Sequence, residues 1–354
     1  MKINKKTKIF LGGFVNITNA QNLNCLALAE YLDKDKYDVY TMYFIKGDFE
    51  IKPIAGVKFW KVPMPYRIFK YYIWLKGILV CDILYLPKLE QHKYITFWNK
   101  IFRKKTIYTV ETIYRDYMYK KVIQNNNSIT AFTQKIDSFS KVYSITEYMH
   151  KYNTKNIGLR SDGILHLGVN TNIFKNSIKR WRLSDIIFIG NNMKYKGIED
   201  YISMAMRFPQ LKFHIAGGGG NYNIKEEISK HNLPNIVIHG SLSHDKLCKL
   251  LEGVQLMYFP SRLEGFPKVV LECAAAGVPS ILYNDYGADE WIISGKNGFV
   301  VKDMDEAENT IKYLIENPTS LSDLSQGATE LGKSYDWNIV IKEWETVIND
   351  LLSK

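Results

Sequence analysis

Short apolar strands alternate with amphipathic helices along this chain, and the alternation occurs in two runs. The first run ends in the segment ILHLGVNTNIF at 164–174, a charged link follows at 175–182, and a second run then begins. Strands that alternate with helices form a parallel sheet with helices on its faces. A chain of 354 residues is also too long for one ordinary hydrophobic core. The sequence therefore predicts an α/β protein of two domains.

The predicted domain limits follow from this alternation. We expect an N-terminal domain at 1–175, a C-terminal domain at 176–335, and a last helix within 336–354 that packs back on the N-terminal domain. Because open parallel sheets bind ligands at the carboxyl ends of their strands, we expect two such edges to face each other across a cleft. The expected strands are Lys8–Leu11, Tyr37–Phe44, Val57–Val62, Asp82–Leu86, Thr106–Val110, Lys141–Ile145, Asp185–Ile189, Lys212–Ala216, Ile236–His239, Leu256–Phe259, Ser280–Leu282 and Gly298–Val301. The main expected helices are Asn19–Leu32, His92–Arg103, Gly197–Arg207, His244–Leu251, Pro267–Ala276, Asp305–Glu316 and Trp337–Leu352.

Cysteine usage and hydropathy indicate a cytoplasmic protein. The four cysteines are spaced irregularly without a C-x-x-C pair, which argues against a zinc site or a disulfide framework. The N-terminal sequence MKINKKTKIFLGGFVN has an apolar stretch shorter than the one a signal peptide needs. No run approaches the roughly 18 apolar residues of a membrane span.

Charge is distributed unevenly between the two halves. Residues 1–178 hold 28 Lys and Arg against 13 Asp and Glu, whereas residues 179–354 hold 19 against 23. The net charge is thus +15 in the first half and −4 in the second. A basic half indicates an anionic partner, for which a membrane surface, a phosphorylated acceptor and nucleic acid all qualify.

The segment FPSRLEGFPKVVLECAAAGVPS at 259–280 is the most informative part of the sequence. Pro267 suits the first turn of a helix, where its missing N–H costs nothing, and Gly277 suits the position just after a helix. The helix Pro267–Ala276 would direct the free N–H groups of Lys268, Val269 and Val270 toward an anion such as a diphosphate.

Two glutamates flank this expected anion site. Glu264 lies in the turn before the helix, and Glu272 lies about a turn and a half inside it with a side chain that leans back toward the N-terminus. Both carboxylates could accept hydrogen bonds from hydroxyl groups around the anion. The alternative is that Glu264 is a solvated turn residue and Glu272 a surface residue of the helix.

The stretch EGFPKVVLE, followed by AGVPS, resembles the E-x7-E signature of retaining glycosyltransferases of family 4, which have the GT-B fold. The resemblance implies two Rossmann-like domains with parallel sheets facing across a cleft. It also implies that Glu264 binds the hydroxyls of the donor sugar, that the backbone of Gly265 and Phe266 contacts the sugar, and that Glu272 binds the ribose.

Other segments of the second half resemble that family in the same order. FIGNNMKYKG at 188–197 resembles a strand-to-loop motif whose Lys, here Lys196, neutralises the donor diphosphate; Asn191 stands where the family has Arg. HIAGGGG at 214–220 resembles a glycine turn near the nucleotide, which includes Gly217. IHGSLSHDKL at 238–247, with Gly240, resembles the segment whose backbone meets the base. The resemblance spans nearly the whole chain and is strong in the second half and weak in the first.

Two places in the first half are candidates as well. Gly12 and Gly13 resemble the glycine loop that lets the backbone approach the donor, although a plain tight turn after a strand explains them equally well. Glu111 follows the expected strand Thr106–Val110, at a place where relatives carry a His near the reacting groups. It could bind the acceptor or the sugar, or it could only cap the next segment.

The seven histidines show no metal spacing, so we expect no metal ion and no cofactor at the site. Lys196 and the helix dipole would then meet the charge of the leaving diphosphate.

Two basic and aromatic segments bear on membrane contact. His92–Lys105 places its cations on one side of a helix and its aromatic residues on the other, which fits either a helix packed on the sheet or an element that lies on a membrane. The segment YRIFKYYIWLKG at 66–77 mixes aromatic and basic residues around its axis, as an interfacial patch would. Together with the charge of the first half, these segments favour either peripheral association with anionic lipid at the inner face of the cell membrane or capture of a lipid-diphosphate acceptor.

The function that the sequence predicts is transfer of a hexosyl group from a nucleotide-sugar donor, by default a UDP-sugar, with retention of configuration. The acceptor would be a glycan or a lipid-diphosphate-linked saccharide, in a pathway such as O-antigen or capsule synthesis. One alternative is a nucleotide-sugar 2-epimerase of the same fold. Another is a basic nucleic-acid-binding protein, but Arg is scarce beside Lys and no binding motif for nucleic acid is recognised.

Overall fold

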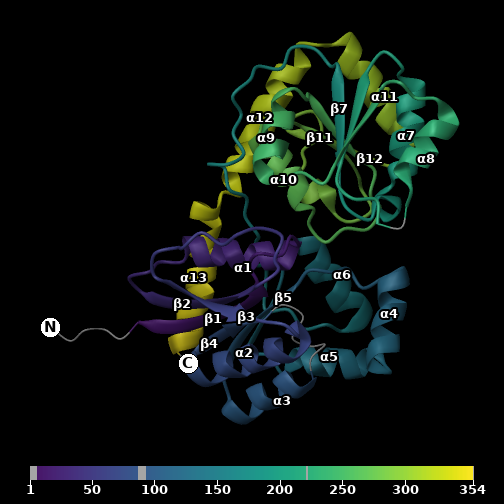
Figure 1. The fold of residues 1–354 in the computed structure, drawn as a ribbon. Helices are drawn as coiled ribbons and strands as arrows, with labels where there is room; N and C mark the ends of the chain where they lie inside the picture. Colours follow the sequence, from purple (N-terminus) through teal and green to yellow (C-terminus); the bar gives the residue numbers. More distant parts are fainter. Residues whose placement is uncertain (1–5, 87–92, 221, 354) are drawn as a thin grey trace. The chain divides into compact units, whose positions relative to one another are not determined.

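The computed structural model describes residues 6–86, 93–220 and 222–353. The chain divides into two compact units, Met1–Leu167 together with Trp337–Lys354, and Gly168–Asp336. Each unit is built on a six-stranded parallel sheet with helices around it (Figure 1). The predicted α/β class with two parallel sheets is therefore confirmed.

The sheet of the first unit has the strand order β3-β2-β1-β4-β5-β6. From β1 the chain first builds β2 and β3 on one side, and then returns to the other side of β1 with β4. Ligands of such sheets bind at the carboxyl ends of the strands where the order reverses, which here is between β1 and β4. The strands are β1 (Thr7–Phe14), β2 (Tyr37–Phe44), β3 (Val57–Val62), β4 (Ile83–Tyr85), β5 (Lys105–Val110) and β6 (Lys141–Ser144).

Several helices of the first unit begin at polar side-chain caps. Asn19 accepts a hydrogen bond from the N–H of Asn22 at the start of α1, and Thr146 caps α6 in the same way. The last helix belongs to this unit: α13, yellow in Figure 1, packs on α1. The helices are α1 (Ala20–Tyr31), α2 (Tyr66–Val80), α3 (Lys93–Phe102), α4 (Asp116–Asn126), α5 (Ile129–Asp137), α6 (Glu147–Ile157) and α13 (Trp337–Ser353).

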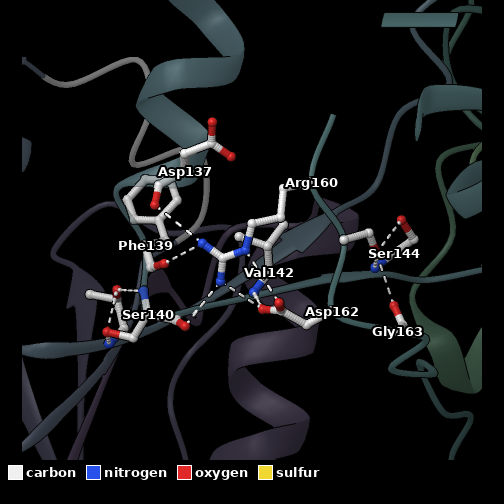
Figure 2. Close-up of polar contacts among 10 residues, drawn as sticks. Asp137, Phe139, Ser140, Val142, Ser144, Arg160, Asp162 and Gly163 are labelled. Atoms are coloured by element: carbon white, nitrogen blue, oxygen red, sulfur yellow. Dashed lines mark hydrogen bonds and ion pairs between the residues drawn. The ribbon is translucent and has the colours of Figure 1, made fainter. Parts of the chain in front are cut away.

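Arg160 fixes the segment that follows α6. Its guanidinium donates to three backbone carbonyls within 137–140 and pairs with Asp162, with an N···O distance of 2.8 Å (Figure 2). Asp162 also accepts from the N–H of Val142 on β6 at 2.8 Å. Burial raises the pKa of Asp162, but the hydrogen bonds from Arg160 and Val142 outweigh it, and the pKa lies below its ordinary value. This cluster ties the chain after α6 to the last strand of the sheet.

The sheet of the second unit repeats the same topology with the order β12-β11-β10-β7-β8-β9. From β7 the chain builds β8 and β9 on one side and then returns beside β7 with β10, so the order reverses between β7 and β10. The strands are β7 (Asp185–Ile189), β8 (Lys212–Ala216), β9 (Ile236–Gly240), β10 (Leu256–Phe259), β11 (Ser280–Tyr283) and β12 (Gly298–Val301). The helices are η2 (Met193–Lys196), α7 (Ile198–Arg207), α8 (Ile224–His231), α9 (His244–Glu252), α10 (Lys268–Ala275), η3 (Ala288–Glu290), α11 (Met304–Glu316) and α12 (Ser320–Ser334).

Helix α12 was not predicted, because Gly327 and Gly332 interrupt its pattern and glycine is a poor helix former. Both glycines lie at close contacts. A Cβ atom on Gly332 would be 2.4 Å from the Cα of Ala275 in α10, and one on Gly327 would be 2.1 Å from the carbonyl oxygen of Lys296. Gly332 therefore allows the helix to pack tightly against α10, and Gly327 allows it to approach the segment that holds Lys296.

The apolar side chains of α3 are mostly exposed. The interpretation of this helix as one that packs its apolar side on the sheet is therefore wrong. Ile95 is buried, but Tyr94 is 78% exposed and Phe97 is 58% exposed. Helix α2, which packs beside α3, also exposes Ile68 and Tyr72 while it buries its other side. His92, where this helix was predicted to begin, lies outside the described residues. None of the helices within the described ranges is long and apolar enough to cross a membrane.

Candidate functional site

The carboxyl ends of β7 and β10 bring the main candidate residues together. Lys196 ends the short helix η2 that follows β7, and Glu264 lies in the turn that follows β10. Since these two strands are neighbours at the point where the strand order reverses, both residues lie where this type of sheet binds its ligands. The residues are 68 positions apart in the sequence.

Lys196 and Glu264 form an ion pair. The distance from Lys196 Nζ to Glu264 Oε1 is 2.5 Å, and the same oxygen accepts from the hydroxyl of Ser261 at 2.8 Å. The side chains are only 25% and 13% exposed, so solvent screens the pair weakly. Lys196 Nζ also lies 5.1 Å from the centroid of the Phe259 ring. Glu264 is therefore not the solvated turn residue of the alternative interpretation.

The helix after Glu264 begins one residue later than predicted. Pro267 is the N-cap residue of α10 and has an extended backbone, and the helix itself covers Lys268–Ala275. The N–H of Val270 donates to the carbonyl of Pro267 at 2.9 Å, so the prediction that this group is free is wrong. The N–H of Val269 donates to no atom within the described residues. Gly277 follows the helix with φ +74°, as predicted for the residue after a helix end.

Glu272 is partly buried and lies close to the first turn of its own helix and to α9. Burial raises the pKa of its carboxyl, against the opposing effects of His244 at the start of α9 and Lys268 at the start of α10. It is therefore not a simple surface residue. Phe266 is held in an aromatic cluster, with its ring centroid 4.8 Å from that of Trp291 and 5.5 Å from that of Tyr335.

Glycines at the ends of β8 and β9 bring the backbone close together. Gly217 has φ +119°, and a Cβ atom there would be 2.2 Å from the carbonyl oxygen of Gly190. Its N–H donates to the carbonyl of Gly240 at 2.8 Å. Asn191 accepts from the N–H of Gly218 at 2.7 Å. Asn191 thus orders this turn, and its amide cannot supply the positive charge that an arginine would.

The interpretation of Gly12 and Gly13 as a loop after a strand is wrong. Both residues lie inside β1 and are buried, and the pairing with β2 shifts between Leu11 and Phe14, as at a β-bulge. A Cβ atom on Gly12 would be 2.1 Å from the side chain of Leu86, and one on Gly13 would be 2.8 Å from the sulfur of Cys25. Close packing therefore explains why both positions hold glycine.

Glu111 follows β5 and borders a cavity of about 400 Å³ in the first unit. Its Oε1 accepts from the hydroxyl of Thr109 at 2.9 Å and from that of Tyr85 at 3.3 Å. The other lining side chains mix aromatic, amide and basic groups, a composition typical of sites for polar ligands with apolar faces. They include Gln21, Tyr108, Tyr114, Lys121, Asn125, Asn126, Phe132 and Lys135.

Three further residues around Glu264 were not singled out from the sequence. Ser261 orients the carboxylate, and a Ser three residues before the Glu was the available signal. Tyr286 and Trp291 are buried, and the Tyr286 hydroxyl and the Trp291 Nε1 have no hydrogen-bond partner within the described residues. Burial raises the pKa of Tyr286, and the Glu264 carboxylate raises it further. The Tyr286 hydroxyl thus lies near Glu264, and the Trp291 ring lies beside that of Tyr286.

Histidines of the second unit are held by other side chains. His214 contacts Asp185 at 2.8 Å through Nε2 and His239 at 2.9 Å through Nδ1. Burial lowers the pKa of His239, and His214 lowers it further. Across the described part of the chain, no group of three or more His, Cys, Asp or Glu side chains is arranged to hold a metal ion.

Comparison with known proteins finds similarity to glycosyltransferases in the second unit. Residues 170–331 match the model of the family described as glycosyl transferases group 1. The alpha-galactosylglucosyldiacylglycerol synthase of Streptococcus pneumoniae is 30% identical over 172 residues, which is 46% of each chain. The matched region spans 46% to 62% of the first three curated relatives.

Solved structures resemble the fold over nearly the whole chain. Sucrose-phosphate synthase from Thermosynechococcus elongatus has a TM-score of 0.81 at 13% identity and covers 99% of this chain and 100% of its own. Anabaena HepE, solved in complex with UDP-glucose, has a TM-score of 0.74 at 15% identity over 98% of this chain and 100% of its own. At these identities the likeness shows the fold, which is that of GT-B glycosyltransferases.

Proposed function

We propose that this protein transfers a sugar from a nucleotide-sugar donor to a hydroxyl group of an acceptor, with retention of configuration, because residues 170–331 match the model of the family described as glycosyl transferases group 1. The observation that carries the proposal is the Lys196–Glu264 pair at the reversal of strand order in the second sheet. A UDP-sugar is the proposed donor, and the complex of HepE with UDP-glucose supports this choice.

The donor sugar is assigned to Glu264 and the diphosphate to Lys196. Glu264 Oε1 is occupied by Lys196 and Ser261, which leaves Oε2 to accept from sugar hydroxyls. An ammonium group has three donors, so Lys196 can keep its bond to Glu264 and still donate to a phosphate oxygen. The backbone of Gly265 and Phe266 would contact the sugar from the same turn.

The nucleotide is assigned to the start of α10 and to the ends of β8 and β9. The N–H of Val269 and the helix dipole favour an anion at the N-terminus of α10. Glu272 would accept from the ribose hydroxyls, and the open space beside Gly240 would accommodate the base. Gly217, which has no side chain, would let the backbone after β8 lie close to the phosphates.

Catalysis in this proposal is electrostatic and requires no metal ion. The bond between the anomeric carbon and the diphosphate oxygen breaks, and its electron pair stays with the diphosphate. The acceptor oxygen bonds to the anomeric carbon on the same face, and its proton passes to the departing phosphate oxygen. Lys196 and the N-terminus of α10 stabilise the charge that develops on the diphosphate. Glu264 positions the sugar through its hydroxyls.

The acceptor is proposed to be a saccharide attached to a membrane lipid. The cavity beside Glu111, with its aromatic and amide lining, would hold an acceptor sugar. Exposed apolar side chains of α2 and α3 lie among the basic residues Arg67, Lys70, Lys100 and Arg103, which suits peripheral contact with an anionic membrane at its cytoplasmic face. The name of the pneumococcal relative, a glycosyldiacylglycerol synthase, supports a lipid acceptor. A role in O-antigen or capsule synthesis would fit as well.

The proposal predicts that the full chain releases a nucleoside diphosphate from one class of nucleotide-sugar, faster when vesicles carry a glycolipid acceptor. UDP-, GDP-, ADP- and TDP-glucose would each be tested with anionic vesicles that contain glucosyldiacylglycerol. Proton NMR of the product should show the α-anomeric configuration of the donor. A β-product would contradict retention, and the absence of release from all four donors would contradict the function.

A further inference from the structure

A polar cavity of about 270 Å³ lies in the second unit between α12 and the segment 176–180. Hydroxyls and amides line it, and three of its side chains are cationic, namely Lys179, Arg180 and Lys333, whereas Glu330 is its one carboxylate among the described lining residues. A water molecule occupies about 30 Å³ in the liquid, so the cavity has room for a phosphate group and several further atoms.

Arg180 is a buried cation without a carboxylate partner. It is 3% exposed, and within the described residues its guanidinium donates only to neutral acceptors. Two of these are the carbonyls of Leu251 and Val254, each at 2.9 Å, at the C-terminal end of α9. That helix end offers a partial negative charge, but the desolvated cation is not fully compensated. Burial accordingly lowers the pKa of Arg180 to about 10.

Two exposed lysines that line the cavity add to this positive charge. Lys179 and Lys333 are exposed and neither forms an ion pair within the described ranges. Charge-assisted hydrogen bonds from cations to phosphate oxygens are among the strongest that proteins make. The hydroxyls of Ser322 and Thr329 lie on the α12 side of the same cavity. Such a lining suits an anion that also carries hydroxyl groups.

We propose that this cavity binds a small phosphorylated polyol or sugar, with the phosphate between Arg180, Lys179 and Lys333 and the hydroxyls against α12. The site is distinct from the proposed donor site. Helix α10 begins just after Glu264, whereas Ser325 and Asn176 of the cavity contact Gly277 at its other end; Ser325 donates to the Gly277 carbonyl at 2.7 Å. Eight helical residues separate the two ends by about 12 Å.

The test is a calorimetric titration of the full chain with inorganic phosphate and with glycerol 3-phosphate. Lys179→Gln with Lys333→Gln should weaken both affinities at least about tenfold, because two charge-assisted contacts are lost. Lys212→Gln with Lys246→Gln, which removes two exposed charges elsewhere on the unit, should leave them within about twofold. Glu330→Gln should strengthen binding, because it removes the like charge.

The same titrations separate this site from the donor site. Lys196→Gln, which removes the proposed diphosphate contact, should leave phosphate affinity within about twofold, and a melting temperature for each variant verifies its fold. Loss of phosphate binding in Lys196→Gln alone would assign the anion to the donor site and overturn the proposal. Equal affinities in the two double variants, or no binding by the unaltered chain, would also overturn it. None of these results depends on which nucleotide-sugar is the donor.

Discussion

Glu264→Gln is expected to lower the rate of sugar transfer about a thousandfold without unfolding the protein. The amide keeps the shape of the side chain but removes the negative charge that holds Lys196 and Ser261. In a partly desolvated site, one such preorganised contact contributes roughly two to three powers of ten to a rate. Loss of the sugar contact and displacement of Lys196 act together here. The rate of nucleoside diphosphate release at saturating donor measures the effect.

Glu316→Gln is the matched control for this substitution. Glu316 is an exposed glutamate at the end of α11 with no ion pair among the described residues, and its loss should leave the rate within about twofold. Circular dichroism should show the same fold in both variants. A Glu264→Gln rate within about threefold of the unaltered chain would mean that Glu264 takes no part in transfer.

Gly332→Ala is expected to destabilise the second unit by about 3 kcal/mol. The new methyl group would lie 2.4 Å from the Cα and 2.5 Å from the amide nitrogen of Ala275, and backbone atoms cannot turn away as a side chain can. Helices α10 and α12 must therefore separate, and overpacking of this kind costs about 1–3 kcal/mol or more. The gain in helix propensity from glycine to alanine returns only about 1 kcal/mol.

Urea unfolding followed by tryptophan fluorescence measures this loss as a lower midpoint. Gly253→Ala is the control, because a Cβ atom there meets only the carbonyl oxygen of Leu250 at 3.7 Å and its φ of −89° is open to any residue. Its free energy of unfolding should stay within about 0.5 kcal/mol of that of the unaltered chain. A Gly332→Ala midpoint equal to that of the control would contradict the tight contact between α10 and α12.

The sequence predicts much of the fold because local signals agree with one another. Strands such as β2 and β7 have the predicted limits, and the apolar run of β7 is bounded by Ser184 and Gly190. The helix α10 was located by Pro267 and Gly277, whose preferences depend only on the local backbone. Local preference alone was not enough to place the helix start correctly. It put Pro267 inside the helix, whereas the chain is still extended at Pro267.

Contacts between distant parts of the chain are what the sequence cannot give. Lys196 and Glu264 were each expected to face a ligand, and their mutual ion pair appears only when β7 and β10 lie side by side. Gly12 and Gly13 resembled a loop because a strand rarely contains two glycines, yet Leu86 and Cys25 require their small size inside β1. Glycines with a packing role and glycines in a turn look alike in one sequence.

Binding of a nucleotide-sugar at α10 is the central claim, and a thermal-shift screen tests it most directly. UDP-, GDP-, ADP- and TDP-glucose would be added to the full chain and to Glu272→Ala. A donor at 100 times its dissociation constant stabilises the folded state by about 2.7 kcal/mol. We predict that one nucleotide, expected to be UDP, raises the melting temperature by several degrees, and that Glu272→Ala loses most of this rise. No rise with any of the four, in a chain that melts cooperatively, would contradict the account.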